Sequence, residues 1–158
     1  IEHFYKYPKK YSFCFQMTAY ISRLAKLRNV LKTAKEDDII ITERCVFSDY
    51  NVFAKMLHST GQINDIEFQC YTKWFDEFLK DIPGILFVYI ETDFVNCHSR
   101  VMSRSREGEE SISKEYLEMC QKYHNEWLNE EKNKITLNGN LDTSSFAEHF
   151  YILKQIII

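Results

Sequence analysis

Residues 85–90 read Ile-Leu-Phe-Val-Tyr-Ile and directly follow Pro83-Gly84. Six consecutive apolar residues, several of them β-branched or aromatic, predict a strand that is buried on both faces. Such strands belong to parallel sheets that are covered by helices on both sides. Residues 38–42 (Asp-Ile-Ile-Ile-Thr) and 134–137 have a similar character, so we expect three strands.

The segments around these strands have the apolar spacing of amphipathic helices. One runs from Ser12 to Ala34, and a last one begins at Ser144 or Ser145. Thr92 and Ser113 are suitable N-caps for two of the others. Because buried strands alternate with helices, we predict the α/β class and one domain over residues 1–158. The remaining predicted helices cover residues 45–58, 65–80, 92–103 and 114–131.

Composition excludes several classes of protein. The 158 residues carry 20 basic and 23 acidic side chains, a net charge of −3, which excludes a generally basic nucleic-acid binder. No apolar run approaches the ~18 residues of a membrane span, so we expect neither a nucleic-acid nor a membrane partner. The five cysteines lack C-x-x-C spacing and the five histidines lack metal spacing, so no metal site is predicted. The cysteines are those of an intracellular protein, which we expect in the cytoplasm rather than in mitochondria.

Charged residues follow two of the predicted strands, at the end of the sheet where α/β proteins bind ligands. Glu43 and Arg44 come after residues 38–42, and can face a polar ligand or form a structural ion pair. Arg100, Arg104 and Arg106 follow residues 85–90. These arginines can converge on a polyphosphate, or can form a solvated face with local Arg–Glu pairs.

Phe15-Gln16 lies on the first predicted helix. A glutamine amide can pair with a base edge through two hydrogen bonds, and a neighbouring aromatic ring can stack on the base. The alternative is that Phe15 belongs to the core and Gln16 to the surface.

Taken together, four segments resemble the deoxynucleoside kinase family, near its deoxycytidine and deoxyguanosine kinase branch. The resemblance covers residues 2–142 almost continuously, and it implies a P-loop NTPase-type three-layer sandwich with a parallel sheet flanked by helices. It also implies a homodimer that transfers the γ-phosphate of ATP to the 5′-hydroxyl of a deoxynucleoside in nucleotide salvage, with Mg²⁺ accompanying ATP. The four segments are residues 5–16 (Tyr-Lys-Tyr-Pro-Lys-Lys-Tyr-Ser-Phe-Cys-Phe-Gln), 42–54 (Thr-Glu-Arg-Cys-Val-Phe-Ser-Asp-Tyr-Asn-Val-Phe-Ala), 104–110 (Arg-Ser-Arg-Glu-Gly-Glu-Glu) and 115–128.

The resemblance implies which side chains bind the deoxynucleoside. Gln16 would pair with the base between the rings of Phe15 and Phe53. Tyr5 and Glu109 would bind the sugar 3′-hydroxyl. By resemblance, Arg23 and Asp49 match the branch that accepts purines or cytosine, and a charged pair beside Gln16 would crowd the methyl group of thymine.

The same resemblance implies the groups that act on phosphate. Glu43 and Arg44 would lie near the 5′-oxygen and the transferring phosphate. The lid over ATP would consist of Arg100, Arg104 and Arg106. The segment Asn138-Gly139-Asn140 would approach the adenine of ATP.

The chain also departs from the family pattern. Cys45 replaces a usual serine, Gly108-Glu109 replaces two acids, and Tyr11 stands where tryptophan is frequent. No glycine is followed by lysine, so the phosphate loop G-x-x-x-x-G-K-[ST] has no counterpart, and neither does the family's general base. We therefore expect the C-terminal portion of a longer kinase, with the first strands missing from this chain. The alternatives are a nucleoside monophosphate kinase similar to thymidylate kinase and a catalytically dead nucleoside-binding module.

Overall fold

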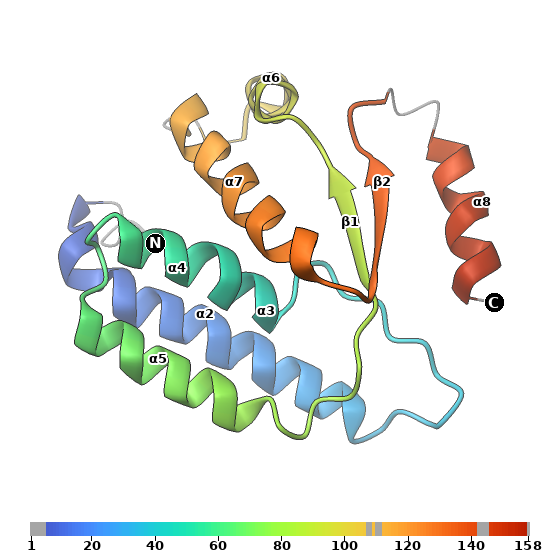
Figure 1. Cartoon of the computed structure of the whole chain (residues 1–158), viewed down its shortest axis with the longest axis horizontal. Helices are drawn as coiled ribbons and strands as arrows, with labels where there is room; N and C mark the ends of the chain where they lie inside the picture. The colour runs from blue at the N-terminus through green and yellow to red at the C-terminus, as the bar shows by residue number, and fades with distance from the viewer. Residues whose placement is uncertain (1–5, 107–108, 110–111, 142–145, 158) are drawn as a thin grey trace. The chain divides into compact units, whose positions relative to one another are not determined.

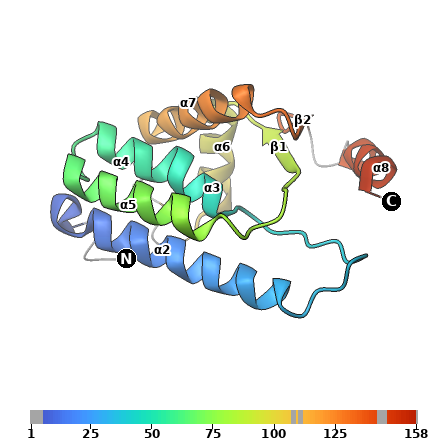
Figure 2. The same cartoon turned by 60° about the horizontal axis from the view of Figure 1, so that its bottom comes forward.

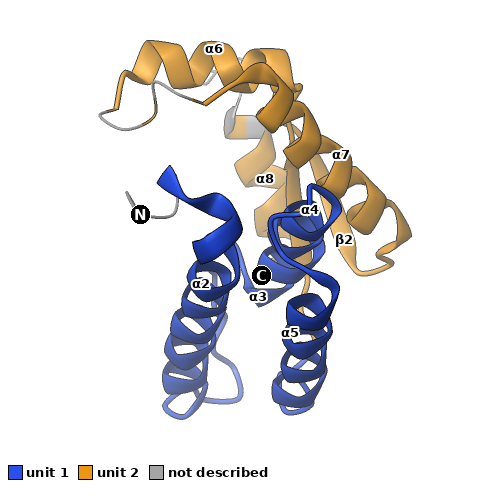
Figure 3. Ribbon diagram, turned by 90° about the vertical axis from the view of Figure 1, so that its left-hand side faces the viewer, with its two compact units in different colours: residues 1–83 blue, residues 84–158 orange. Residues whose placement is uncertain are grey.

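The computed structural model describes residues 6–106, 109, 112–141 and 146–157. The chain divides into two compact units, Ile1–Pro83 and Gly84–Ile158, which are coloured separately in Figure 3. The first unit is helical and the second contains the strands (Figure 1). Each unit contains its own set of candidate residues.

The long helix α2, Pro8–Leu31, forms one side of the first unit. Pro8 occupies its first turn, where a missing N–H costs no hydrogen bond. The buried polar residues Ser12 and Gln16 lie one turn apart, and Tyr20 and Leu24 continue the same stripe. The expected helix over residues 12–34 is confirmed, although it begins four residues earlier and ends three residues earlier.

A composite helix follows, made of α3 (Val46–Ser48), η1 (Asp49–Ala54) and α4 (Lys55–Ser59). The central segment η1 is a π-helix, whose hydrogen bonds span five residues instead of four. The predicted helix over residues 45–58 is thus confirmed in extent, but its middle is wound more widely than an α-helix. Helix α5, Asp65–Phe78, comes next. Its N-terminus is a capping box, in which Asn64 and Glu67 each bind the other's backbone N–H.

The core of this unit is aromatic. Tyr20 on α2 and Tyr71 on α5 are fully buried, with ring centroids 5.4 Å apart. Tyr50 on η1 stacks on Phe75 of α5 at 4.2 Å. Packing of these rings brings α2, η1 and α5 together and so fixes where their polar side chains lie. Met17, Leu24, Val46 and Ala54 complete the cluster.

Residues 38–42 do not form the predicted strand. The segment is irregular, with Ile39 57% and Ile41 82% exposed. A β-branched run becomes a strand only when a neighbouring strand pairs with its N–H and C=O groups. In the described part of the chain no strand lies beside it.

The second unit contains two parallel strands, β1 (Phe87–Glu91) and β2 (Lys134–Asn138), with Tyr89 opposite Thr136. The connection between them includes α6 (Phe94–Arg104) and α7 (Lys114–Glu130), which pack against each other. Parallel strands need such a helical crossover. Helix α8, Phe146–Ile157, follows β2 in the chain.

The strand β1 is less buried than six apolar residues suggested. Exposure alternates along it, and Val88 and Ile90 are 38% and 56% exposed. The expectation of a strand buried on both faces is therefore wrong: its position is confirmed, but only one face is covered.

The caps of the second unit follow the sequence in part. The Ser113 side chain accepts a hydrogen bond from the Tyr116 N–H and caps α7, as predicted. Thr92 does not cap α6; the N-cap is Asp93, and the Thr92 hydroxyl donates to the carbonyl of Ile90. Ser144 and Ser145 lie outside the described residues. Among the helices described, none combines the length and the apolar character needed to cross a membrane.

Candidate functional site

The first unit contains a buried ion pair. The Arg23 guanidinium, through Nη1, contacts both carboxylate oxygens of Asp49. Asp49 is 3% exposed, whereas the Arg23 side chain is 32% exposed. Burial raises the pKa of the Asp49 carboxyl, and Arg23 and then Arg44 oppose that rise. The contact between Arg23 and Asp49 is thus present as the sequence suggested, and it joins α2 to η1.

Gln16 belongs to the same cluster. Its side chain is 3% exposed, and its Nε2 donates to the backbone carbonyl of Asp49 at 2.9 Å. The amide is therefore not on the surface, which corrects the alternative that we considered for it. This bond uses one of two N–H donors. A second N–H and the carbonyl oxygen make up the donor–acceptor pair that a base edge requires.

Tyr71 is a residue of this cluster that sequence reasoning did not single out. Its ring is fully buried, and its hydroxyl has no hydrogen-bond partner among the described residues. Burial, and then the Asp49 carboxylate, raise the pKa of Tyr71 well above its ordinary value, and the Gln16 amide beside the hydroxyl opposes that rise. The sequence showed only an apolar helix position at residue 71, because helical spacing does not reveal what a tyrosine hydroxyl faces.

Phe15 and Phe53, the predicted walls of the base site, are both half-buried. Phe15 lies on α2 next to Gln16, and Phe53 lies on η1. The Arg44 guanidinium lies over the Phe53 ring at 5.2 Å from its centroid, a cation–π arrangement. The structure therefore links Arg44 and Phe53, a relationship that the sequence did not indicate.

Glu43 and Arg44 are both exposed. Within the described part of the chain neither one forms an ion pair, so the structural pair that we considered for them is absent there. Arg44 has a φ of 60°, in the left-handed region that a side chain rarely adopts. Strained backbone of this kind is concentrated at functional positions.

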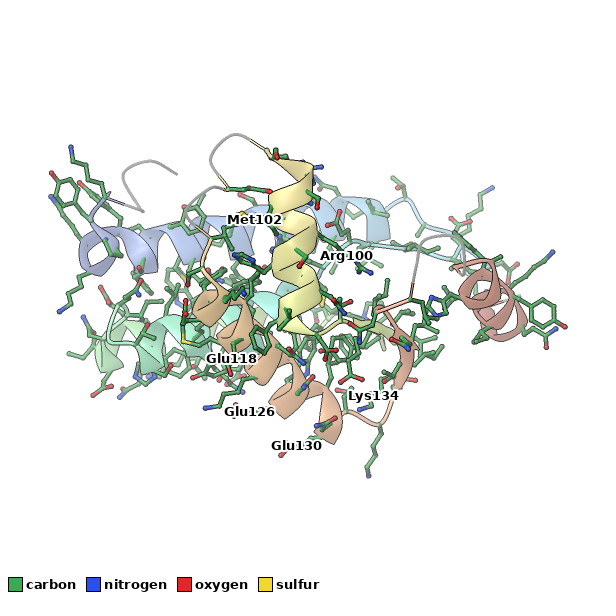
Figure 4. All side chains as sticks on the ribbon, turned by 90° about the horizontal axis from the view of Figure 1, so that it is seen from above. Arg100, Met102, Glu118, Glu126, Glu130 and Lys134 are labelled. Atoms are coloured by element: carbon green, nitrogen blue, oxygen red, sulfur yellow. The ribbon has the colours of Figure 1, made fainter. Side chains whose placement is uncertain are left out.

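In the second unit the predicted lid arginines have different partners. Arg100 lies on α6 (Figure 4), and its Nη2 donates to the Leu141 carbonyl at 3.2 Å. Arg104 ends α6, and its Nε and Nη2 both donate to Oε2 of Glu109, at 3.2 and 2.7 Å. Arg106 is exposed. The sequence alternative of local Arg–Glu pairing thus holds for Arg104.

Asn138, Gly139 and Asn140 form a turn that ties the end of β2 to the end of β1. The Gly139 N–H donates to the Glu91 carbonyl at 2.7 Å. Asn140 Oδ1 accepts from the Asp93 N–H at 2.9 Å and from Asn96 Nδ2 at 2.8 Å. Asn138 Oδ1 accepts from the N–H of Asn140. These bonds give the segment a structural role, in addition to the approach to adenine that the resemblance implied.

Tyr5 lies outside the described residues. Among those described, no group of three or more His, Cys, Asp or Glu side chains is arranged to hold a metal ion. The predicted site residues therefore fall into two sets. Phe15, Gln16, Arg23, Glu43, Arg44, Asp49 and Phe53 belong to the first unit, and Arg100, Arg104, Arg106, Glu109 and 138–140 belong to the second.

Comparison with known proteins identifies the family. Residues 1–155 match the family model described as deoxynucleoside kinase. A probable deoxycytidine kinase of fowlpox virus is 34% identical over 134 residues, covering 82% of this chain and 55% of the relative. Human deoxycytidine kinase is 32% identical, covering 81% of this chain and 52% of its own length. The chain spans about half the length of these curated relatives.

A solved structure shows the same fold. The structure of deoxyadenosine kinase from M. mycoides with bound dCTP superimposes with a TM-score of 0.80 at 22% identity, covering 99% of this chain and 79% of that chain. This chain belongs to the deoxynucleoside kinase family. Its fold is accordingly the α/β fold of the P-loop NTPase type that the sequence predicted.

Proposed function

We propose that the protein transfers the γ-phosphate of ATP to the 5′-hydroxyl of a deoxynucleoside, with a purine or cytosine base favoured over thymine, in nucleotide salvage. The observation that carries this proposal is the arrangement of Gln16, Arg23 and Asp49 in the first unit. Relatives named as deoxycytidine and deoxyguanosine kinases support it.

The first unit would recognise the base. Gln16 is held in place by its bond to the Asp49 carbonyl, so its amide is oriented before a base arrives. Phe15 and Phe53 would enclose the base. The Arg23–Asp49 pair adds charge beside the amide, which suits the amino and carbonyl groups of a purine or cytosine edge better than a methyl group.

Charged groups in both units would act on the phosphate and the sugar. Glu43 and Arg44 would act at the 5′-oxygen, where the exposed and strained Arg44 can neutralise developing charge. Arg100, Arg104 and Arg106 would bind the phosphates of ATP, and Glu109 would accept a hydrogen bond from the 3′-hydroxyl. In phosphoryl transfer, such positioning and charge neutralisation provide most of the catalysis.

The residues of this chain do not account for every part of a kinase. The sequence contains no G-x-x-x-x-G-K-[ST] loop. The described residues gather no acidic cluster to hold Mg²⁺ by themselves, so we assign no residue to the metal that accompanies ATP. The Asn138-Gly139-Asn140 turn would approach adenine only through its backbone, because the Asn138 and Asn140 side chains take part in the turn.

The test is ATP-dependent phosphorylation of the four deoxynucleosides by the protein as its gene encodes it. We expect turnover of deoxyguanosine, deoxyadenosine or deoxycytidine, with thymidine the poorest substrate. A preference for thymidine would overturn the base assignment. Phosphorylation of deoxynucleoside monophosphates instead would overturn the kinase class in favour of a nucleoside monophosphate kinase. Binding of deoxynucleosides without turnover would indicate a non-catalytic module.

We propose that the protein forms a homodimer through α2 and α5. These two helices pack against each other (Figure 2). Their side chains form a groove of about 460 Å³, lined by the apolar Ile21, Leu24, Ala25, Trp74 and Phe78 together with the polar Arg28, Asn29 and Lys32. Ile21, Trp74 and Phe78 remain 45%, 47% and 37% exposed beside it. Adjacent large apolar side chains on a surface are typical of a protein interface.

Light scattering after size-exclusion chromatography tests the dimer. We expect Trp74→Glu to halve the particle mass. The matched control is Ile66→Glu, because Ile66 is 75% exposed on the same helix but does not line the groove. A monomeric parent protein, or an unchanged mass for the Trp74 variant, would overturn this interface.

A further inference from the structure

Arg104 and Glu109 form a pair with a definite geometry. Two nitrogens of the guanidinium donate to the same carboxylate oxygen, Oε2. Between them, Ser105 is the C-cap of α6 and has a φ of 47° in the left-handed region. The Ser105 hydroxyl donates to the Met102 carbonyl at 2.8 Å, and the Glu109 N–H donates to the Arg106 carbonyl at 3.1 Å. Backbone and side chains together thus hold the two residues in contact.

The pair has an open side. The side chains of Arg104 and Glu109 are 47% and 24% exposed. Because both N–H groups fall on Oε2, the second oxygen, Oε1, retains its capacity to accept a hydrogen bond. A carboxylate oxygen is also a stronger acceptor for a hydroxyl than a neutral oxygen is.

Arg104 differs in this respect from Arg100, one turn earlier on the same helix. The Nη2 of Arg100 donates to a backbone carbonyl, that of Leu141, and Arg100 forms no ion pair with any described residue. Equal spacing on one helix therefore does not give the two arginines equal surroundings. The predicted lid role, which treats them alike, leaves the contact between Arg104 and Glu109 unexplained.

We propose that Arg104 is a positioning residue for the sugar: it holds the Glu109 carboxylate so that Oε1 accepts the 3′-hydroxyl of the deoxynucleoside. This inference rests on the proposed function, in which Glu109 binds that hydroxyl. A free glutamate side chain loses rotamer freedom when it binds a ligand, and the contact with Arg104 removes that freedom in advance. Arg104 thereby contributes to discrimination between nucleosides with and without a 3′-hydroxyl.

The experiment measures kcat/KM for a deoxynucleoside and for its 2′,3′-dideoxy analogue, using the protein as its gene encodes it. The ratio of the two values reports recognition of the 3′-hydroxyl. For Glu109→Ala we expect this ratio to fall about 10- to 100-fold, the range for a hydrogen bond to a charged group. For Arg104→Ala we expect a fall of about tenfold with a higher KM for the deoxynucleoside, and for Arg104→Lys a smaller fall, because lysine keeps the charge but not the fork.

Two controls separate this role from others. Arg100→Ala is expected to raise the KM for ATP and to leave the ratio unchanged. Lys122→Ala removes an exposed pair with Glu126 on α7 and should change neither quantity. If Arg104→Ala raises the KM for ATP and keeps the parent ratio, the positioning role is overturned. If the parent protein phosphorylates no deoxynucleoside, the proposed function itself is overturned. This outcome is seen in the parent protein alone, so it is distinct from a failure of the positioning role.

Discussion

The Asp49 carboxylate is buried between helices, and the guanidinium of Arg23, one third exposed, contacts both of its oxygens. The negative charge of Asp49 thus lies in the protein interior, and the partly exposed guanidinium of Arg23 neutralises it. A charge in such a position is destabilising unless its partner is present. The pair therefore couples the stability of the first unit to a group that we assign to base recognition.

Replacing Arg23 should reveal that coupling. We expect Arg23→Met to lower the free energy of unfolding by about 3 kcal/mol, because a buried carboxylate loses its counter-charge. Urea denaturation measures the change. The double variant Arg23→Met, Asp49→Leu removes both charges and should regain most of the loss.

The same variant has a pH dependence with a definite sign. Burial raises the pKa of Asp49, and without Arg23 the strongest opposing influence is gone. The folded state then binds the proton more tightly than the unfolded state, so stability rises as the pH falls through the folded pKa. The difference between parent and Arg23→Met should shrink at acidic pH; a difference that grows instead would contradict our account of the pair.

The left-handed backbone at Arg44 makes a second prediction. Glycine adopts a φ of 60° without steric cost, whereas alanine does not. We expect Arg44→Gly to be more stable than Arg44→Ala by about 1 kcal/mol. Both variants lose the contact with Phe53, so the comparison isolates the backbone. If Arg44 acts on the phosphate, both also lose phosphorylation. Equal melting temperatures for the two variants would show that the backbone is not strained.

A third prediction follows from the close approach of neighbouring atoms to Gly139. A Cβ at this position would lie 2.0 Å from Thr92 Oγ1, 2.8 Å from Ile90 Cγ2 and 3.0 Å from the Glu91 carbonyl oxygen. We expect Gly139→Ala to destabilise the protein by about 2 kcal/mol, since strand ends must separate to admit the methyl group. Gly84→Ala is the matched control, because a Cβ there meets no atom within 4 Å. Thermal unfolding that is the same for both would exclude the close approach at Gly139.

A fourth prediction concerns stability at alkaline pH, and it follows from the raised pKa values of two tyrosines. Burial raises the pKa of Tyr20 to about 12, and that of Tyr89 to about 12, from 10.0. In the unfolded chain these hydroxyls ionise first, so the stability that they provide is complete below pH 10 and is lost as the pH rises through 12. The free energy of unfolding should fall across that interval. Tyr20→Phe should make the fall less steep, and an unchanged slope would contradict the assignment.

The sequence predicted those elements whose signals are local. The cap at Ser113 works as predicted because a serine side chain needs only the first turn of its own helix. Helices α2 and α5 have long apolar stripes, and their partners in the core are each other's aromatic rings. Local spacing is sufficient for both.

The failures concern properties that depend on neighbours. Residues 38–42 have the composition of a strand, but a strand exists only when another pairs with it. Residues 85–90 are apolar throughout, yet exposure alternates along β1, because burial depends on what covers each face. The contact between Arg104 and Glu109 depends on the left-handed turn at Ser105, for which serine gives no signal.

The sequence was sufficient to predict which residues belong to the candidate site, but not which contacts they make. Resemblance pointed to Gln16, Arg23 and Asp49 as one group, and the structure brings these three together. Resemblance alone did not show that the Gln16 amide binds the Asp49 carbonyl, nor that the buried Tyr71 hydroxyl lies in the same cluster without a hydrogen-bond partner among the described residues. Such details depend on packing between helices.

The π-helix η1 has a consequence for how this chain tolerates insertions and deletions. Each residue of an α-helix turns the chain by about 100°. A π-helix winds more widely, so it uses about one residue more than an α-helix for the same rotation. We therefore expect that removing one residue from Asp49–Ala54 lets the segment rewind as an α-helix with little change in the direction of the helix beyond it, so that Met56 and Leu57 stay buried. Inserting one residue, or removing two, would instead turn these side chains away from the core, so this segment should tolerate one particular change of length and no other.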